Sequence, residues 1–333
     1  RSLWKNRTRT LVTIVGIILS AAMFAAVATL GVSLRQYMVD ITIYNTGDYF
    51  IRFDNATAEE VEAIQAREEI SRLGIAKTLG YVNVGTEEQN QSYILTALDA
   101  SAFEMRTILV KDGRLPEAPG EIAVPEHCLW YLQAMGMAGE LGETVSLDVV
   151  PRYEDEYYYD HMPEFPISDI PNFTETYVIV GILDNESSRM GDWSMEPMNF
   201  ITVDDGTHDF HWARLFAKTA DPMDAYALQD ASLSAVCSVN SNLLNYYGAS
   251  RYTNINDLIY TVCAILMVII LACSVSLIYN AFSISLTERA RDFGLLSSVG
   301  ATKKQLRRSV YFEALCLSII GIPIGILCGY FGI

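Results

Sequence analysis

Three long, uncharged apolar runs constrain this chain more than any other feature. They cover Leu11–Leu34, Leu258–Leu286 and Ala314–Ile333, which are 24, 29 and 20 residues long. An α-helix rises about 1.5 Å per residue, so about 20 apolar residues cross the roughly 30 Å hydrocarbon core of a bilayer. We therefore predict an α-helical membrane protein with transmembrane helices at 11–34, 258–286 and 309–333.

The first run follows four basic residues, as the apolar part of a secretory signal peptide does. It is longer than the about 7–15 apolar residues of such a peptide, and no small-x-small cleavage site ends it before Arg35. We interpret it as a membrane helix.

Charge divides the chain into three parts. Residues 1–35 carry five Lys/Arg and no Asp/Glu, residues 36–257 carry 12 against 37, and residues 258–333 carry six against three; the chain carries −17. Because basic residues favour the cytoplasmic side, we expect residues 1–10 and the loop 287–308 in the cytoplasm and the acidic block outside.

The acidic block mixes short alternating runs with short helical patterns, which predicts a large α+β domain inserted between the first and second membrane helices. Thr57 and Glu60 have the spacing of a capping box at a helix start. Further helices are predicted from Ser101, around Cys128–Met135 and at Asp224–Val236. The predicted strands are 48–53, 92–98, 122–124, 144–150, 176–182 and 200–203.

Other features of this block leave alternatives open. Cys128 and Cys237 are its two cysteines, and the sequence alone does not decide whether they pair. The acidic, tyrosine-rich stretch 153–161 fits a solvated loop better than a recognition loop for a cationic peptide. His208 and His211, with Asp204, Asp205 and Asp209 nearby, have weak spacing for a metal site, so we interpret the histidines as structural.

The chain has no motif of a nucleotide-binding or hydrolytic enzyme. It contains no Gly-x-x-x-x-Gly-Lys-Ser/Thr, Gly-x-Ser-x-Gly, His-Glu-x-x-His or Cys-x-x-Cys. We expect a non-enzymatic chain without a cofactor or metal of its own, so any ATP and Mg²⁺ would be bound by a partner. Nucleic acid is not an expected partner.

The loop after the second run has a distinct chemistry. A helix over 258–286 is about 43 Å long, so its end should project from the bilayer and carry Glu288 into water. Phe293, Leu295 and Leu296 then offer a short apolar face before a helix stop at Gly300. Such a segment can lie on the membrane or insert into a partner's groove. Lys303, Lys304, Arg307 and Arg308 follow, where they can meet anionic headgroups.

A resemblance to a known family favours the second alternative, insertion of this segment into a partner's groove. The loop Thr287–Gln305 (TERARDFGLLSSVGATKKQ) resembles the Glu-Arg-x-x-Glu-(Ile/Phe)-Gly-(x)n-Gly-Ala-(Thr/Ser) segment of the FtsX/MacB-like family of ABC transporter permeases. Leu3–Ile17 is similar to the family's entry into its first span. The external block resembles the family's extracytoplasmic domain at Lys111–Pro116, Gly120–Ile122, Leu141–Val145 and Val178–Ile182.

In that family the loop contains a coupling helix that docks on a cytoplasmic ABC ATPase. Asp292 stands where the family usually has Glu, and Ser297 where a basic residue is frequent, which puts one charged contact in doubt. The docking candidates are Glu288, Arg289, Asp292, Phe293, Gly294, Leu295, Leu296, Gly300 and Ala301.

The resemblance implies mechanotransmission: ATP hydrolysis on the partner moves the coupling helices and, through the long second-span helix, the external domains of two permease modules. It also implies a bacterial cell-membrane location and a β-rich insertion at roughly 85–205. The second module is either another copy or the second half of a longer chain, since we expect this sequence to be a fragment of a longer permease. The substrate class would be peptide, antibiotic or lipoprotein. The alternative is a non-transporting regulator or sensor that controls an envelope enzyme or kinase.

Overall fold

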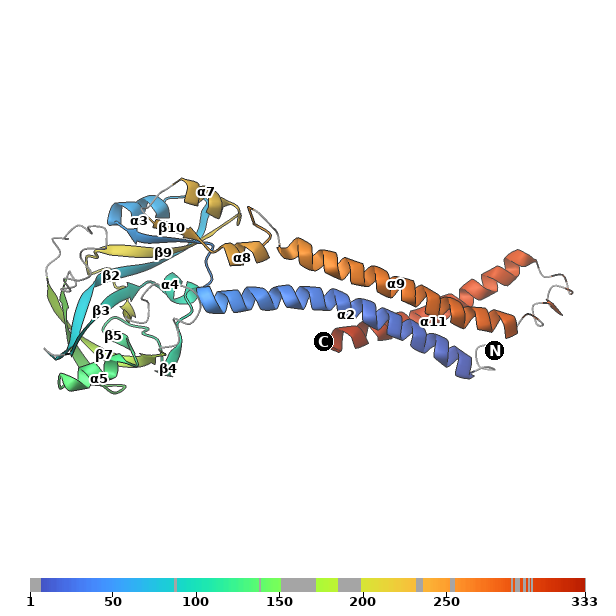
Figure 1. The fold of residues 1–333 in the computed structure, drawn as a ribbon, viewed down its shortest axis with the longest axis horizontal. Coiled ribbons are helices and arrows are strands. Elements are labelled where there is room, and N and C mark those ends of the chain that lie inside the picture. Colours follow the sequence, from blue (N-terminus) through green and yellow to red (C-terminus); the bar gives the residue numbers. More distant parts are fainter. Residues whose placement is uncertain are drawn as a thin grey trace. The chain divides into compact units, whose positions relative to one another are not determined.

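The computed structural model describes residues 7–332 except 87–88, 138, 151–171, 185–198, 232–235, 252–254, 289, 291–293, 296–297, 299 and 301. The chain divides into two compact units. We call residues 1–38 with 254–333 the helical unit and residues 39–253 the sheet unit, and describe each by itself (Figure 1).

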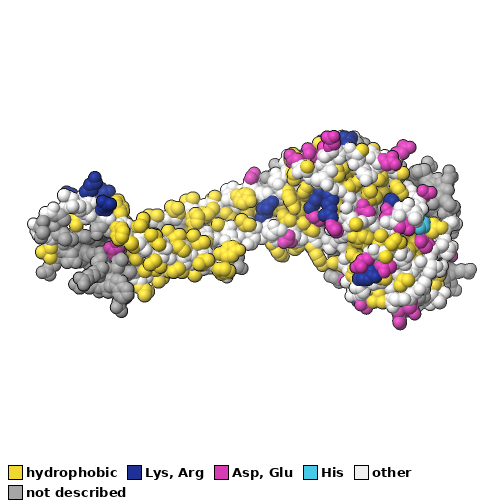
Figure 2. Space-filling model, turned by 180° about the vertical axis from the view of Figure 1, so that it is seen from behind, with side chains coloured by type: hydrophobic (Ala, Val, Ile, Leu, Met, Phe, Trp, Pro, Cys, Tyr) yellow, Lys and Arg dark blue, Asp and Glu magenta, His cyan; other side chains and the backbone are white. Residues whose placement is uncertain are grey.

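In its described residues the helical unit contains three helices that are long and apolar enough to cross a membrane. These are α2 (Arg7–Thr46), whose last turns belong to the sheet unit, α9 (Ile255–Glu288) and α11 (Lys303–Phe331). Hydrophobic side chains cover the outside of these helices (Figure 2). Val268 is 67% exposed and Phe331 is 79% exposed, as expected for helices whose solvent is lipid.

Small residues make the contacts between these helices. A Cβ added to Gly325 of α11 would lie 2.5 Å from the Ile18 carbonyl oxygen and 2.6 Å from the Ala21 Cβ of α2. Gly321 and Gly329, one turn away on either side, approach α2 equally closely. Because glycines bring helix backbones together, this stripe interlocks α11 with α2.

Helix α9 contacts α2 at two other glycines. A Cβ on Gly16 would lie 2.6 Å from Leu277 Cδ2, and one on Gly31 would lie 2.9 Å from Cys263 Sγ. Here glycine makes room for a side chain of the other helix, whereas Gly325 and Gly329 of α11 approach the backbone of α2.

The sheet unit is built on one ten-stranded mixed sheet. Its strands run in the order β10-β1-β9-β2-β3-β8-β5-β7-β4, and β6 pairs with β2 and β7. The β3–β8 and β5–β7 pairs are parallel and the other pairs are antiparallel. The strands are β1 Ile51–Ala56, β2 Ile70–Thr86, β3 Gln89–Leu98, β4 Val110–Gly113, β5 Glu121–Pro125, β6 Thr144–Val150, β7 Phe173–Leu183, β8 Asn199–Val203, β9 Trp212–Thr219 and β10 Val236–Val239.

Short helices pack on this sheet, and side-chain caps begin three of them. The predicted capping box is present: Thr57 N donates to Glu60 Oε2 at 2.8 Å and Glu60 N donates to Thr57 Oγ1 at 3.3 Å. Asp99 and Asn240 cap two others. The helices are α3 Ala58–Gln65, α4 Ala100–Met105, α5 Cys128–Ala134, α7 Asp224–Asp230 and α8 Ser241–Tyr246.

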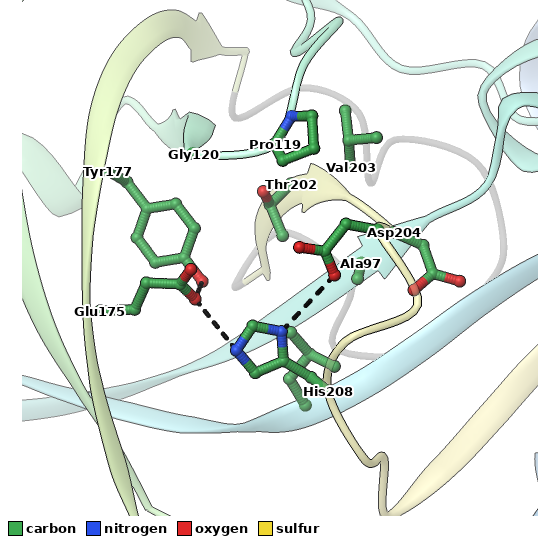
Figure 3. A pocket seen from close by; sticks show the side chains of 11 residues that line it. Ala97, Pro119, Gly120, Glu175, Tyr177, Thr202, Val203, Asp204 and His208 are labelled. Atoms are coloured by element: carbon green, nitrogen blue, oxygen red, sulfur yellow. Dashed lines mark hydrogen bonds and ion pairs between the residues drawn. The ribbon is translucent and has the colours of Figure 1, made fainter.

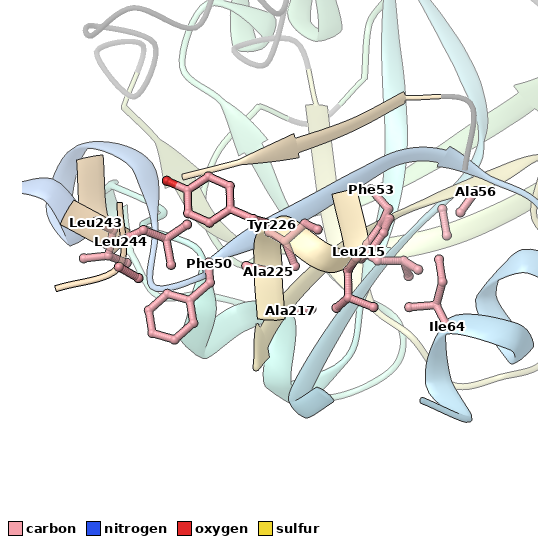
Figure 4. Packing of buried hydrophobic residues seen from close by; sticks show 14 of the residues in the cluster. Phe50, Phe53, Ala56, Ile64, Leu215, Ala217, Ala225, Tyr226, Leu243 and Leu244 are labelled. Carbon is pink, nitrogen blue, oxygen red and sulfur yellow. The ribbon is translucent and has the colours of Figure 1, made fainter. Parts of the chain in front are cut away.

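Three hydrophobic clusters form the core of the sheet unit. One lies around β1 and β9 and contains the fully buried Phe53, Ile64 and Leu215 (Figure 4). A second contains Tyr93 and Phe200 and is covered by α5, and a third lies under α4. The predicted class, three membrane helices with an α+β domain between the first two, is confirmed; the boundaries of the insertion at 85–205 stay a prediction.

The structure decides two local questions, the extent of the helix after Asp224 and the pairing of Cys128 with Cys237. The helix predicted over 224–236 is wrong at its end: α7 stops at Asp230, and Val236 lies in β10, where strand pairing with Asp54 of β1 holds it. Cys128 and Cys237 are both free and lie with different core clusters. Burial raises the pKa of the Cys128 thiol to about 12, which keeps it protonated and unreactive.

Candidate functional site

The predicted docking segment follows α9, whose last residue is Glu288. Of the remaining docking candidates, the structure describes Gly294, Leu295 and Gly300, and all three are exposed. The other candidates, Arg289, Asp292, Phe293, Leu296 and Ala301, lie outside the described residues.

Leu295 presents an apolar side chain to solvent. It is helical and 61% exposed, and Ser298 Oγ donates a 2.8 Å hydrogen bond to its carbonyl oxygen. A single exposed leucine is ordinary on a protein surface. The docking role of this residue therefore stays a prediction.

The turn into α11 is defined by glycine and by a cap. Gly300 has φ +99°, in the region that favours glycine, although a Cβ there would meet nothing within 4 Å. Two residues later Thr302 caps α11: Gln305 N donates to Thr302 Oγ1 at 3.4 Å, and Thr302 N donates to Gln305 Oε1 at 2.9 Å. This Thr-x-x-Gln capping box is readable in the sequence but was not among the predicted helix starts.

Four cations then occupy the first two turns of α11. Lys303, Lys304, Arg307 and Arg308 are all exposed. The Arg307 guanidinium lies 5.9 Å from the centroid of the Tyr311 ring, and its Nη2 lies 3.3 Å from the Tyr311 hydroxyl. The basic charge thus continues directly into an exposed aromatic residue at the start of the apolar part of the helix.

The far end of α2 is fastened inside the sheet unit. Val39 is buried in the cluster around β1. Thr107 Oγ1 donates to the Ile43 carbonyl at 2.8 Å, and Asn240 Nδ2 donates to Thr46 Oγ1 at 2.9 Å. We call these contacts the α2 anchor.

The residues after α2 extend the anchor. Gly47 has φ +97°, and a Cβ there would lie 2.8 Å from the Met105 carbonyl oxygen, so glycine is needed. Asp48 N donates to that same carbonyl at 2.6 Å, and the Asp48 carboxylate pairs with Lys218 Nζ at 2.5 Å. The helix end is therefore held on both sides, by residues next to α4 and by the cap of α8.

The histidine cluster forms a small hollow rather than a ligand site (Figure 3). His208 Nε2 lies 3.3 Å from Glu175 Oε2, and His208 Nδ1 lies 3.7 Å from Asp205 Oδ1. Tyr177 donates to Glu175 at 2.5 Å, and burial, with the Glu175 bond, raises the pKa of the tyrosine. The space is about 10 Å³, enough for about one water molecule.

The other residues that were considered as metal ligands have different contacts. His211 N donates to the Thr78 carbonyl, and Asp204 pairs with Lys77 at 2.6 Å. Among the described residues no three His, Cys, Asp or Glu side chains converge as metal ligands. The tyrosine-rich stretch 153–161 lies outside the described residues.

Comparisons with known proteins identify the class. A family model for the MacB-like periplasmic core domain matches residues 10–234, and one for the FtsX-like permease C-terminal matches residues 264–333. The first match covers more than half of the chain, so the chain belongs to this family: it is an ABC transporter permease of the FtsX/MacB type.

Among individual proteins, the chain is 29% identical over 161 residues to the "Uncharacterized ABC transporter permease YknZ" of Bacillus subtilis (strain 168). That match covers 46% of this chain and 39% of the relative, so the chain spans less than half of the relative's length.

Solved structures give weaker likenesses. The extracellular domain of the noncanonic ABC-type transporter YknZ from Gram-positive bacteria matches with a TM-score of 0.31 and 10% identity, over 57% of this chain and 98% of that one. The periplasmic region of MacB from Actinobacillus actinomycetemcomitans matches with a TM-score of 0.33 and 10% identity, over 66% and 94%.

Proposed function

We propose that this chain is the permease subunit of an ABC transporter that transmits work mechanically. A separate cytoplasmic ATPase, which binds ATP and Mg²⁺, docks on the segment Glu288–Ala301. The resulting motion reaches the sheet unit, which acts on peptide, antibiotic or lipoprotein-like substrates together with a second permease module. The N-terminus and the docking segment lie in the cytoplasm and the sheet unit outside, in a bacterial cell membrane.

One observation carries this proposal. Helix α2 runs without a break from Arg7 to Thr46, is interlocked with α11 through Gly321, Gly325 and Gly329, and ends in the α2 anchor. Thr302 caps α11 directly after the docking segment. A force on the docking segment can thus be transmitted through α11 and α2, which are continuous helices in contact, in addition to α9.

The distribution of charged residues supports action on the substrate outside the membrane and not through a hydrophilic pathway between the helices. The runs 11–34 and 258–286 contain no charged residue, whereas a hydrophilic pathway across the bilayer often requires them. The excess acid of residues 36–257 favours cationic substrates, so binding should weaken as salt rises. Salt-insensitive binding would contradict this choice of substrate.

Docking is tested by purifying the tagged full-length protein from membranes as wild type and as Phe293→Asp. Wild type should retain an ATPase and Phe293→Asp should lose it, because a carboxylate in an apolar groove is costly. Met223→Asp, which adds the same charge at an exposed apolar residue of the sheet unit, should retain it. Absence of an ATPase from all three samples would refute the proposal.

Transport is tested separately, in vesicles reconstituted with the permease and its ATPase. ATP-dependent movement of substrate would exclude the regulator alternative. ATP hydrolysis that changes a partner enzyme or kinase but moves no substrate would support the regulator instead.

A further inference from the structure

The chain passes between the two units twice, at residues 38–39 and again at residues 253–254. We call residues 43–50 of the sheet unit, which end α2 and lead into β1, the entry segment. Residues 240–251, which contain α8 and precede α9, are the exit segment. These segments are far apart in the sequence, so contacts between them are made by the fold and not by chain connectivity.

Asn240 bonds the exit segment to the entry segment. Its Nδ2 atom donates to Thr46 Oγ1 at 2.9 Å across 194 residues of sequence, and its backbone N–H donates to the Phe50 carbonyl at 2.9 Å. Its side-chain oxygen caps α8 by accepting from the Leu243 amide at 3.2 Å. The start of α8 is therefore bonded to the entry segment on both sides of the turn at Gly47.

Lys218 makes a second link between the two segments. Its ammonium lies 2.5 Å from Asp48 Oδ1 in the entry segment. It also lies 5.4 Å from the centroid of the Phe50 ring and 6.0 Å from that of Tyr247, the residue after α8. The two rings meet edge to face at 5.1 Å. One cation is thus attracted by a carboxylate of the entry segment and by an aromatic ring of each segment.

Lys218 belongs to an interior strand of the sheet. It lies in β9, which pairs with β1 on one side and with β2 on the other. The neighbouring Ala217 carbonyl accepts a 2.9 Å hydrogen bond from the Phe50 amide. A displacement of either segment therefore acts on a strand that is hydrogen-bonded along both edges.

The remainder of the exit segment is also held by the sheet unit. Leu243 and Leu244 of α8 lie in the same buried cluster as Phe50 (Figure 4). Arg251 Nη2 donates to the Tyr226 carbonyl at 3.0 Å, and its guanidinium lies 4.7 Å from the centroid of the Tyr226 ring. The exit segment is therefore fixed up to four residues before α9 begins.

We propose that Lys218 couples the entry and exit segments, so that the two connections to the membrane helices move as one joint attached to β9. Its ammonium is the coupling group, because removing it breaks contacts of both segments at once. In this role Lys218 is a positioning residue, which acts through Asp48, Phe50 and Tyr247. The inference rests on the proposed function only in its last step, that a force arrives through α2 and α9.

The first test measures hydrogen exchange in the full-length protein in detergent, without an ATPase. Lys218→Met removes the charge and keeps an unbranched side chain, so exchange should become at least about threefold faster in both segments. Lys218→Arg keeps the charge and the ring contacts and should restore slow exchange. The matched control is Lys111→Met, which removes an ion pair of the same 2.5 Å length, to Glu126, and should leave both segments unchanged.

Three outcomes of this test would overturn the coupling. They are faster exchange in one segment alone, unchanged exchange in both, and an equal increase in Lys111→Met. A Lys218→Arg variant that exchanges as fast as Lys218→Met would also overturn it, because the charge would then not be what joins the segments.

The second test adds the ATPase and compares exchange with and without ATP. In wild type ATP should change exchange in both segments in a fixed ratio, and in Lys218→Met that ratio should shift at least about twofold. An unshifted ratio would exclude Lys218 from transmission. A wild type that binds no ATPase would refute the proposed function, whereas the first test would still decide whether Lys218 joins the segments.

Discussion

The sheet unit and the helical unit place their large apolar side chains in opposite positions. In the sheet unit Phe53, Tyr93 and Leu215 are fully buried, and exposed charge surrounds them. In the helical unit residues such as Val268 and Phe331 are exposed, and glycines stand at the close contacts between the helices. Burial of apolar area lowers the free energy of a protein in water but not in lipid. Membrane helices therefore associate by close approach of their backbones.

The largest expected effect is on the free energy of unfolding, when a buried leucine of the sheet unit and an exposed leucine of the helical unit are each replaced by alanine. Leu215→Ala in β9 should cost about 2–5 kcal/mol of unfolding free energy, because it leaves a cavity in a fully buried cluster. Leu271→Ala in α9, where the side chain is 56% exposed, should cost below about 0.5 kcal/mol. Thermal unfolding of the full chain in detergent compares them, and equal losses would show that α9 is packed against protein.

The next effect is the loss of stability when alanine replaces a glycine at the contact between α11 and α2. Gly325→Ala should cost about 1–3 kcal/mol, because the new methyl group would lie 2.5 Å from the Ile18 carbonyl oxygen and force α11 away from α2. Gly294→Ala is the matched control: the residue is helical and exposed with open space around it, so alanine should be neutral or stabilising by up to about 1 kcal/mol. Tolerance of alanine at both positions would mean that the α2–α11 contact is looser than described.

The two units also differed in how far their structure could be predicted. The membrane helices were recognisable because about 20 uncharged apolar residues have few other stable environments. Helix α2 nevertheless continues past Arg35 to Thr46, because a charge ends an apolar run without ending a helix. Gly321, Gly325 and Gly329 of α11 recur every four residues in the sequence, but this spacing was not among the predictions and does not identify the helix that they contact.

The sheet unit was harder because its strands depend on distant partners. Strand β2 contains Lys77, Gly74 and Gly80, which obscure any alternation, and it is held by pairing with β9 about 140 residues later. Val236 was predicted as the end of a helix, whereas its pairing with Asp54 of β1 makes it a strand residue. The docking residues came from a resemblance, and most lie outside the described residues, so they stay a prediction.

A smaller effect tests how α2 is held in the sheet unit, where hydrogen bonds replace glycine contacts. Asn240→Ala should cost about 1–2 kcal/mol, because it removes the α8 cap and the bond to Thr46. Asn240→Asp keeps the cap acceptor and loses only the donor to Thr46, so it should cost about half as much. Hydrogen exchange at residues 43–47 measures the loosening, and unchanged exchange in both variants would exclude Asn240 from the α2 anchor.

The smallest effect is a pH dependence confined to the sheet unit. Arg114 donates to Glu121 at 2.5 and 2.7 Å, and this pairing, with the amide of Glu117, lowers the pKa of Glu121 from 4.5 to about 2. A pKa lowered by folding contributes stability that is present above pH 4.5 and is lost as the pH falls towards 2. Because the pair is partly exposed, Glu121→Gln should cost only about 1 kcal/mol or less at pH 7. The difference between wild type and variant should shrink below pH 4.5, whereas a difference that is constant with pH would mean that Glu121 acts through packing and not through its charge.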